Sequence, residues 1–510
     1  MGALSVPLQS TSLPPVPPEP LYRPHRMPSP NLTDTLQATA PLPLVVDLDG
    51  TLTPVDTLVE SVRALAVQNP RALISLPRWL LRGRAVLKAE VSSRVALDVQ
   101  SLPLRADFIE YLAQQKAQGR TLVLATAADR RIAEAFATRL GFFDQVLASD
   151  GAVNLKGRTK LAAIQEKVGG RFVYAGDSHA DVPIWQAASA AVLVGVPAAL
   201  ARQVRENVAI ESEFAEAGAS WRVWAKALRI HQWLKNILIF VPLLTSFSLT
   251  DPGKVASALL AFLAFSVVAS ATYLGNDIWD LDADRAHPRK RNRPFASGAL
   301  PIQVGVPVAL ALIAIGLALG ALVSSTFLAV LSAYLVSTTA YSFVLKRYVL
   351  IDVVMLASLY TLRVVAGAVA ISVTISPWLL AFCVLTFFSL ALVKRCSELV
   401  SFQRAGRNSA SGRDYQVSDL TVLWPLGIGA GLCSVVVFGL FVGTVAQAGR
   451  YAHAEMLWLV GLGLLYWIGR LWIKTSRGEM HDDPIVYTLS DFGTRTVLLL
   501  MVATTIAAYI

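Results

Sequence analysis

The sequence predicts two unlike parts: an N-terminal α/β Rossmann-like domain with a small helical cap, then an all-α polytopic bundle of about nine transmembrane helices. Of its 510 residues 54% are hydrophobic and only 16% charged, whereas soluble proteins carry about a quarter charged residues. The long apolar segments begin after about residue 220, and short apolar runs alternate with amphipathic stretches before it. This shift in composition divides the chain in two.

The N-terminal composition, the cysteine spacing and the net charge exclude several classes of protein. Residues 1–40 are rich in proline and lack an apolar period, so we expect a disordered tail and no secretory signal peptide. The three cysteines lie in apolar segments without ligand spacing, which indicates neither disulfides nor a zinc site. The net charge of +10 fits basic cytoplasmic loops of a membrane protein, and no nucleic-acid partner is expected.

Residues 41–216 predict a doubly wound parallel sheet. Brief apolar runs at 44–46, 121–125, 145–148, 172–175 and 191–194 alternate with amphipathic stretches such as 106–118 and 131–140, which is typical of βαβ units. The segment of about residues 54–103 is long enough to form a small helical cap. Ligands of such sheets bind beyond the carboxyl ends of the strands, and polar residues follow several of these runs: Asp47, Asp49, Thr126, Lys160, Asp177 and Asp181.

The runs DLDGT, LATAADR, GRTK and GDSHADVP that carry these residues resemble, in order, the four motifs of the haloacid dehalogenase superfamily. The resemblance implies that Asp47 is a nucleophile forming an aspartyl-phosphate and that Asp49 is the general acid/base. It also implies that Thr126 and Lys160 bind phosphoryl oxygens, and that Mg²⁺ is held by Asp47, Asp49, Asp177 and Asp181. A folded but inactive domain is the alternative interpretation.

Residues 217–235 predict an interfacial linker helix, because Trp221, Trp224 and Trp233 alternate with basic residues directly before the apolar spans. In 236–510 we expect spans at about 236–250, 254–275, 302–322, 325–345, 350–371, 376–395, 421–445, 453–473 and 493–510. The charged connections 285–293, 346–347, 394–413 and 474–477 are all even-numbered. The positive-inside rule therefore places them and the N-terminal domain on the cytoplasmic side of a bacterial-type inner membrane.

An acidic run follows the second of these spans. Asp277, Asp280 and Asp284 recur at spacings of three and four, so on a helix they share one face. Three carboxylates at this density suit Mg²⁺ together with substrate phosphates, and the basic segment 285–293 that follows suits an anion. A solvated, salt-bridged loop is the bland alternative.

The pattern Asn276-Asp277-x-x-Asp280-x-x-x-Asp284 resembles the first signature of the UbiA superfamily of intramembrane prenyltransferases, over about residues 221–510. No second D-x-x-x-D run follows the sixth span, where Lys394-Arg395-x-x-Glu398 stands instead. With HQWxKN at 231–236 and DADRAHPxKRxRP at 282–294, the chain resembles the decaprenyl-phosphate phosphoribosyltransferase branch. That resemblance implies that further residues bind substrate: Lys235, Asn276, Arg291, Tyr341, Lys346, Asp352, Arg363, Lys394 and Glu398. Asp352 as a helix cap and Arg363 as a snorkelling or carbonyl-paired residue remain alternatives.

The two resemblances together imply a bifunctional, Mg²⁺-dependent membrane enzyme. Its transferase half would move 5-phosphoribosyl from phosphoribosyl pyrophosphate to a polyprenyl phosphate, making a cell-wall precursor, and its N-terminal domain would remove the 5-phosphate. One alternative is prenylation of an aromatic or quinone precursor by a prenyl diphosphate. Another is a regulatory or anchoring role for an N-terminal domain that only binds a phosphometabolite. Homo-oligomerisation is left open.

Overall fold

The computed structural model describes residues 41–215, 220–406, 413–447, 451–480 and 484–510. The proline-rich tail expected at 1–40 lies outside these residues. The remainder of the chain, from Leu42 to Ile510, forms one compact unit.

A six-stranded, wholly parallel sheet forms the centre of the N-terminal domain, in the order β3-β2-β1-β4-β5-β6. The strands are β1 (Leu44–Val46), β2 (Leu122–Asp129), β3 (Gln145–Ser149), β4 (Val173–Gly176), β5 (Ala190–Val194) and β6 (Ile210–Phe214). The predicted fold class is confirmed. Edge strand β6 was not predicted, although its alternating Ile-Glu-Ser-Glu-Phe pattern carries the period of two that indicates a half-buried strand.

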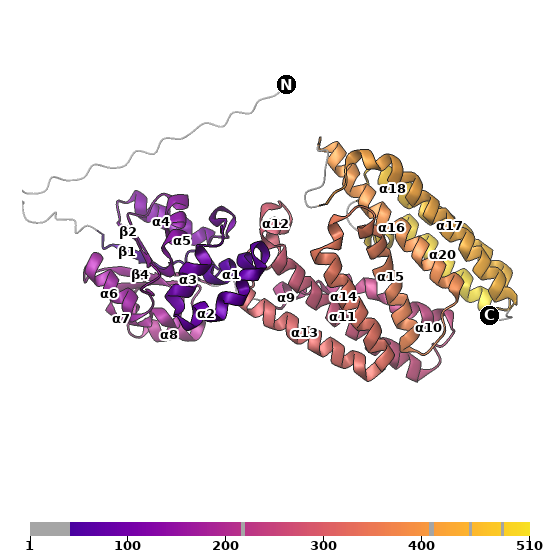
Figure 1. Cartoon of the computed structure of the whole chain (residues 1–510), viewed down its shortest axis with the longest axis horizontal. Helices are drawn as coiled ribbons and strands as arrows, with labels where there is room; N and C mark the ends of the chain where they lie inside the picture. The colour runs from indigo at the N-terminus through magenta and orange to yellow at the C-terminus, as the bar shows by residue number, and fades with distance from the viewer. Residues whose placement is uncertain (1–40, 216–219, 407–412, 448–450, 481–483) are drawn as a thin grey trace, which may run out of the picture. The chain divides into compact units, whose positions relative to one another are not determined.

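Helices cover both faces of this sheet (Figure 1). Helices α4 (Ala106–Ala117) and α5 (Arg130–Leu140) bury Phe108 and Phe136 against the face that carries Leu44 and Val46. The opposite face, with Val45, packs against α6 (Arg158–Lys167), α7 (Val182–Ala187) and α8 (Ala198–Arg205). Since successive strand residues point to opposite faces, a strand as short as β1 serves both hydrophobic layers.

The expected cap is helical and follows β1 directly. It consists of α1 (Thr57–Gln68), a 3₁₀ turn η1 (Pro70–Ser75), α2 (Leu76–Leu81), α3 (Arg84–Ser92) and a second 3₁₀ turn η2 (Val99–Ser101). Asp56 caps α1 by accepting hydrogen bonds from the amides of Leu58 and Val59. This N-cap fixes the residue at which α1 begins.

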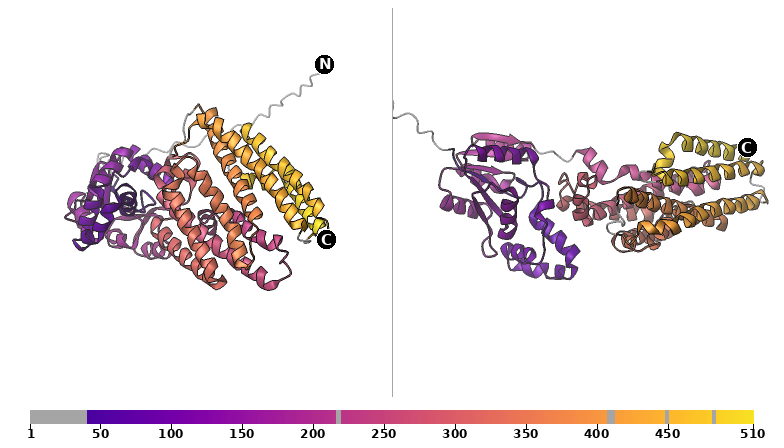
Figure 2. Two further views of the ribbon diagram at one scale, coloured as in Figure 1. Left: turned by 45° about the vertical axis from the view of Figure 1, so that its right-hand side comes forward. Right: turned by 90° about the horizontal axis from the view of Figure 1, so that it is seen from above.

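In the described residues, eight helices are long and apolar enough to cross a membrane, rather than the nine expected. They are α11 (Pro252–Trp279), α13 (Ile302–Val323), α14 (Ser325–Phe343), α15 (Ile351–Ala370), α16 (Pro377–Arg404), α17 (Leu420–Gln447), α18 (Leu457–Ser476) and α20 (Phe492–Tyr509). Helices α16, α17, α18 and α20 pack in succession and form the orange-to-yellow layer in Figure 2. The protein is therefore a multi-pass membrane protein.

The expected span at 236–250 forms shorter elements instead. After the short helix α9 (Trp221–Ala227) come the 3₁₀ segment η4 (Ile230–Phe240) and α10 (Val241–Thr245). Within η4, Asn236 donates to the Ser266 hydroxyl at 3.0 Å. A Cβ atom on Gly367 of α15 would lie 2.0 Å from the carbonyl oxygen of Ile239. Because the backbones approach so closely, tertiary packing, rather than apolar length, decides the conformation here.

Candidate functional site

The first candidate site lies where the strand order reverses, between β1 and β4. Asp47 and Asp49 directly follow β1, and Asp177 follows β4, so one sheet edge brings them together. Gly50 has φ +78°, and a Cβ atom there would lie 2.1 Å from an Asp177 carboxylate oxygen. Glycine is therefore required at this turn, both for its backbone conformation and for the approach of Asp177.

A buried network surrounds the Asp47 carboxylate. Lys160, from the start of α6, donates to Asp47 at 2.6 Å and to the Tyr174 hydroxyl at 3.0 Å. Tyr174 in turn donates to Asp181 at 2.8 Å. Lys160 and Asp181 are 3% and 1% exposed. The lysine thus holds one oxygen of the proposed nucleophile in place and offers the positive charge that a phosphoryl group needs.

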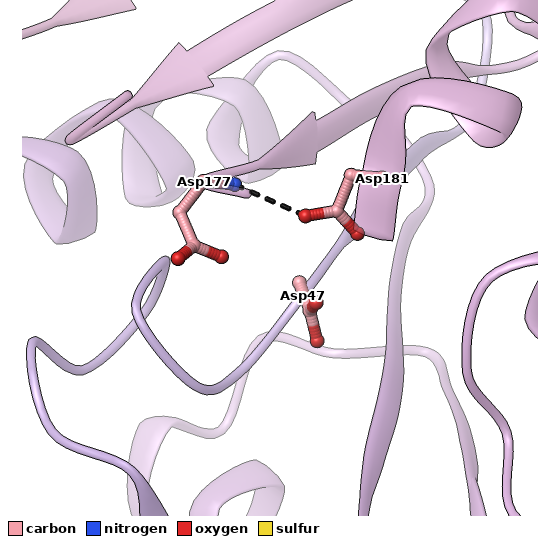
Figure 3. Close-up of side chains that lie close together, drawn as sticks. All are labelled: Asp47, Asp177 and Asp181. Carbon is pink, nitrogen blue, oxygen red and sulfur yellow. Dashed lines mark hydrogen bonds between the residues drawn. The ribbon is translucent and has the colours of Figure 1, made fainter. Parts of the chain in front are cut away.

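Among the described residues, the one set of three metal-ligating side chains with ligand atoms within 4.8 Å of one another is Asp47, Asp177 and Asp181. Figure 3 shows the carboxylates of Asp47 and Asp177 facing the same space. One Asp181 oxygen is already occupied by the amides of Asp177 and Ser178, at 3.3 and 3.1 Å. These residues fit Mg²⁺, which takes few carboxylates plus phosphate oxygens. Asp47 and Asp177 would hold the ion, and Asp181 would orient its neighbours. Asp49, which was also expected to be a ligand, is not part of this set.

Burial and neighbouring negative charges raise the pKa values of the carboxyl groups in this site. Burial, with Asp56 nearby, raises the pKa of Asp49 to about 7. Burial, with Asp47 nearby, raises the pKa of Asp177 to about 8, and burial also raises the pKa of Asp47. A carboxyl with a pKa near neutrality can both give and take a proton. This suits the acid/base role expected of Asp49, whose carboxylate accepts a hydrogen bond from the Thr57 amide at 2.9 Å.

Two further residues here were not found from the sequence. Tyr174 lies inside β4, and its sequence context does not distinguish it from an ordinary core residue of a strand. Lys88 of α3 reaches from the cap to the Ala127 carbonyl at 2.5 Å and to Asn154 at 3.1 Å. No sequence motif marks Lys88.

Thr126, which was predicted to close its strand, lies within β2 at a register shift. Its hydroxyl accepts a hydrogen bond from the Ala128 amide at 3.0 Å.

Replacing Tyr174 by phenylalanine removes the hydroxyl that joins Lys160 to Asp181. The variant leaves Lys160 and Asp181 each without one buried hydrogen-bond partner, and such a loss costs about 1–3 kcal/mol. We therefore expect hydrolysis of a phosphate monoester to fall by roughly tenfold or more. Initial rates with p-nitrophenyl phosphate check this. Tyr111→Phe, which removes the hydroxyl bonded to Glu211 at 2.5 Å away from the site, serves as control. An unchanged rate for Tyr174→Phe would remove this residue from the site.

The second candidate site lies at the end of α11. The helix ends at Trp279, Asp280 is its cap, and a separate short helix, α12 (Leu281–Ala286), follows. The acidic run is therefore not one continuous helix face as expected, although the Asp284 amide still donates to the Asp280 carbonyl at 2.9 Å. Despite the break, Asp277 and Asp284 share Arg293 as a partner, whereas Asp280 pairs with Lys346.

Each of these three carboxylates forms an ion pair with an arginine or a lysine side chain. Asp277 accepts from Arg229 and, at 3.1 Å, from Arg293. Arg293 also donates to Asp284 at 2.6 Å, and Lys346 donates to Asp280 at 2.8 Å. Arg229 has the unusual φ of +49° and lies 4.8 Å from the centre of the Tyr273 ring. Arg293 belongs to the basic segment expected to suit an anion, and Arg229 was expected only as a basic residue of the interfacial helix; neither was predicted to contact the acidic run.

The other predicted substrate residues fall into two groups. Arg363 lies in the bundle interior, where it donates to Asn236 at 2.8 Å and to Tyr334 at 3.0 Å. Fully buried Asp352 pairs with Arg395 at 2.6 Å, and Glu398 pairs with Arg395 and with Arg413. The remaining five are Lys235, Asn276, Tyr341 and Lys394, which are half-buried, and Arg291, which is exposed. Lys235 lies 5.9 Å from the Tyr360 ring centre.

Comparison with known proteins assigns both halves. A model of the UbiA prenyltransferase family matches residues 239–490, and a model of haloacid dehalogenase-like hydrolases matches residues 44–186. The protein y4nM of Sinorhizobium fredii is 40% identical, with 88% of each chain covered. Nodulation protein NoeC of Azorhizobium caulinodans is 35% identical over 55% of this chain and 91% of NoeC. Decaprenyl-phosphate phosphoribosyltransferase of Mycobacterium tuberculosis is 36% identical over 39% of this chain and 68% of that enzyme.

The membrane bundle and the strand-end carboxylates define a membrane transferase joined to a phosphatase-type hydrolase. The chain belongs to the UbiA prenyltransferase family and carries an N-terminal haloacid dehalogenase-like domain.

Proposed function

We propose that this protein transfers 5-phosphoribosyl from phosphoribosyl pyrophosphate to a polyprenyl phosphate and then removes the 5-phosphate. The observation that carries the proposal is the intact aspartate–lysine site, which shares one chain with a transferase half that is 36% identical to decaprenyl-phosphate phosphoribosyltransferase. The first reaction makes a phosphate monoester, which is the substrate class of the second site.

In the transferase half, an oxygen of the lipid phosphate attacks C1 of the sugar, and the bond from C1 to the pyrophosphate oxygen breaks. Mg²⁺, held by Asp277, Asp280 and Asp284, would supply positive charge to the leaving pyrophosphate. In the described structure these three side chains do not bring their ligand atoms within 4.8 Å of one another, so the carboxylates would have to converge on the ion. Binding there requires that Arg229, Arg293 and Lys346 release the carboxylates that they now contact. In the proposal these same cations turn to substrate phosphates, so that charge remains balanced when the site fills.

In the N-terminal domain, a carboxylate oxygen of Asp47 attacks the phosphorus of the 5-phosphate, and the bond to the sugar oxygen breaks. Asp49 gives its proton to that oxygen. A water molecule then attacks the aspartyl-phosphate, Asp49 takes the proton, and inorganic phosphate leaves. Lys160 and Thr126 contact the phosphoryl oxygens, and Mg²⁺ on Asp47 and Asp177 would neutralise their charge. We also propose that both sites face the cytoplasm of a bacterial-type inner membrane, where sugar pyrophosphates are available.

Purified protein incubated with polyprenyl phosphate, phosphoribosyl pyrophosphate and Mg²⁺ tests the proposal. Mass spectrometry of the lipid is expected to show a ribosyl adduct, with inorganic phosphate and pyrophosphate released in equal amounts. A phosphoribosyl adduct alone would remove the second step. A lipid without sugar, combined with transfer from a prenyl diphosphate to an aromatic acceptor, would favour the alternative prenylation chemistry and contradict the proposal.

A further inference from the structure

The first cap helix, α1, contacts the short helix α12 that follows the acidic run. Along this contact four charged side chains alternate in sign: Asp282, Arg63, Glu60 and Arg285. The Arg285 guanidinium donates to both oxygens of Glu60, at 2.6 and 3.0 Å, and Arg63 donates to Asp282. The Nε atom of Arg63 lies 3.7 Å from a Glu60 oxygen. Together these two acidic and two basic side chains carry no net charge.

This contact is buried at its centre. The side chains of Glu60 and Arg285 are 1% and 2% exposed. Arg285 also donates to the Ala296 carbonyl at 3.3 Å. A buried ion pair adds little net stability, but removing one partner leaves an uncompensated charge. Such a pair therefore selects one docking geometry strongly against all others, which is the property that a positional anchor needs.

Apolar groups close the same contact at a second point. Val59 of α1 packs against the buried cluster that contains Phe295 and Leu300. Gly298 has φ +77°, and a Cβ atom there would lie 2.6 Å from Pro54 Cγ and 3.2 Å from Pro103 Cγ. The cap ends therefore approach the backbone of the membrane part so closely that a methyl group would not fit.

Helix α1 also contacts one residue of the first candidate site and the residue that follows Asp284 of the second. Its first amide, on Thr57, holds Asp49 at 2.9 Å, and one turn later Glu60 holds Arg285. Arg285 directly follows Asp284 of the acidic run, which Arg293 contacts at 2.6 Å. One helix turn thus separates the contact to the proposed acid/base from the contact to Arg285, the chain neighbour of Asp284.

We propose that α1 is a docking helix that fixes the hydrolase domain to α12 of the transferase, with Glu60 and Arg285 as its positioning residues. Its consequence rests on the proposed function: the phosphorylated lipid made in the bundle reaches Asp47 without mixing into the bulk membrane pool. The docking itself is independent of what the substrate is. It leaves the hydrolase site complete, since neither residue contacts Asp47, Asp177 or Lys160 in the described structure.

Hydrogen–deuterium exchange of the full chain in detergent, without substrate, tests the docking in Glu60→Gln and, separately, in Gly298→Ala. We expect exchange to accelerate at least about tenfold in both 57–68 and 281–286. Hydrolysis of p-nitrophenyl phosphate should stay within about twofold of wild type. In the coupled lipid assay the phosphoribosyl adduct should accumulate. The double variant Glu60→Gln/Arg285→Gln should exchange no faster than Glu60→Gln alone, because the uncompensated arginine is gone.

Glu211→Gln is the matched control, since Glu211 accepts two hydrogen bonds from Arg120, at 2.5 and 3.0 Å, within the hydrolase domain. It should leave exchange in 281–286 unchanged. Exchange in Glu60→Gln that is unchanged, or faster in 57–68 alone, would overturn the docking. Faster exchange in both segments, with neither a ribosyl nor a phosphoribosyl lipid formed by any sample including wild type, would retain the docking and refute the proposed function. Faster exchange in both segments with ribosyl lipid formed and no accumulation of the phosphoribosyl adduct would overturn the direct hand-over.

Discussion

Replacing Asp47 by asparagine is expected to abolish phosphate release from the lipid-linked phosphoribose, by at least about a thousandfold, while the first transfer continues. The amide is nearly isosteric but cannot attack phosphorus, and it removes one of the two charges proposed to hold Mg²⁺. Lys160, which donates to Asp47 at 2.6 Å, keeps an acceptor, so the fold should survive. The measurement is inorganic phosphate release together with accumulation of the phosphoribosyl lipid.

Asp98→Asn is a suitable control, because Asp98 is an exposed residue that caps η2 in the same domain, and asparagine caps equally well. Its phosphate release should match wild type. Persistent release by Asp47→Asn would assign the hydrolysis to another residue or show that the domain does not process this lipid.

Replacing Asp277 by asparagine is expected to lower phosphoribosyl transfer by at least about a hundredfold. Asp277 is 2% exposed and accepts from both Arg229 and Arg293, so the variant loses a proposed metal ligand and the charge that holds two guanidinium groups. Formation of the lipid adduct from labelled phosphoribosyl pyrophosphate is the measurement. Hydrolysis of p-nitrophenyl phosphate by the same sample should persist and shows that the protein is folded.

The opposite end of the same helix offers a matched variant. Asp251 caps α11 by accepting from the amides of Gly253 and Lys254, and Asp251→Asn should transfer at the wild-type rate. If Asp277→Asn also transfers normally, the acidic run is structural, as the salt-bridged alternative holds.

The proximity of the acids in the N-terminal domain could be predicted because these residues follow the ends of strands. Asp47, Asp49 and Asp177 occupy loops whose direction a parallel sheet dictates, so linear motifs translate directly into proximity. Tyr174 could not be found this way, since its role depends on Lys160 arriving from α6. Glu60 and Arg285, 225 positions apart, carry no local signal at all.

The membrane half was harder for a related reason. Hydropathy identifies apolar length, and it located the long spans, but it is blind to backbone packing such as that between Gly367 and Ile239, which accompanies the 3₁₀ segment at 230–240. Spacing placed three aspartates on one helix face. It gave no indication that the helix would end at Asp280 or that Arg229 and Arg293 would contact them.

The pairing of every carboxylate in the acidic run with an arginine or lysine has a consequence for biogenesis. A nascent bundle whose acids already have internal counterions can complete insertion and helix assembly in the lipid before it meets any divalent ion. Under the proposed mechanism, loading of Mg²⁺ would then be a late exchange of one cation for another within a finished scaffold, and scarcity of Mg²⁺ would slow turnover without reducing the amount of mature protein.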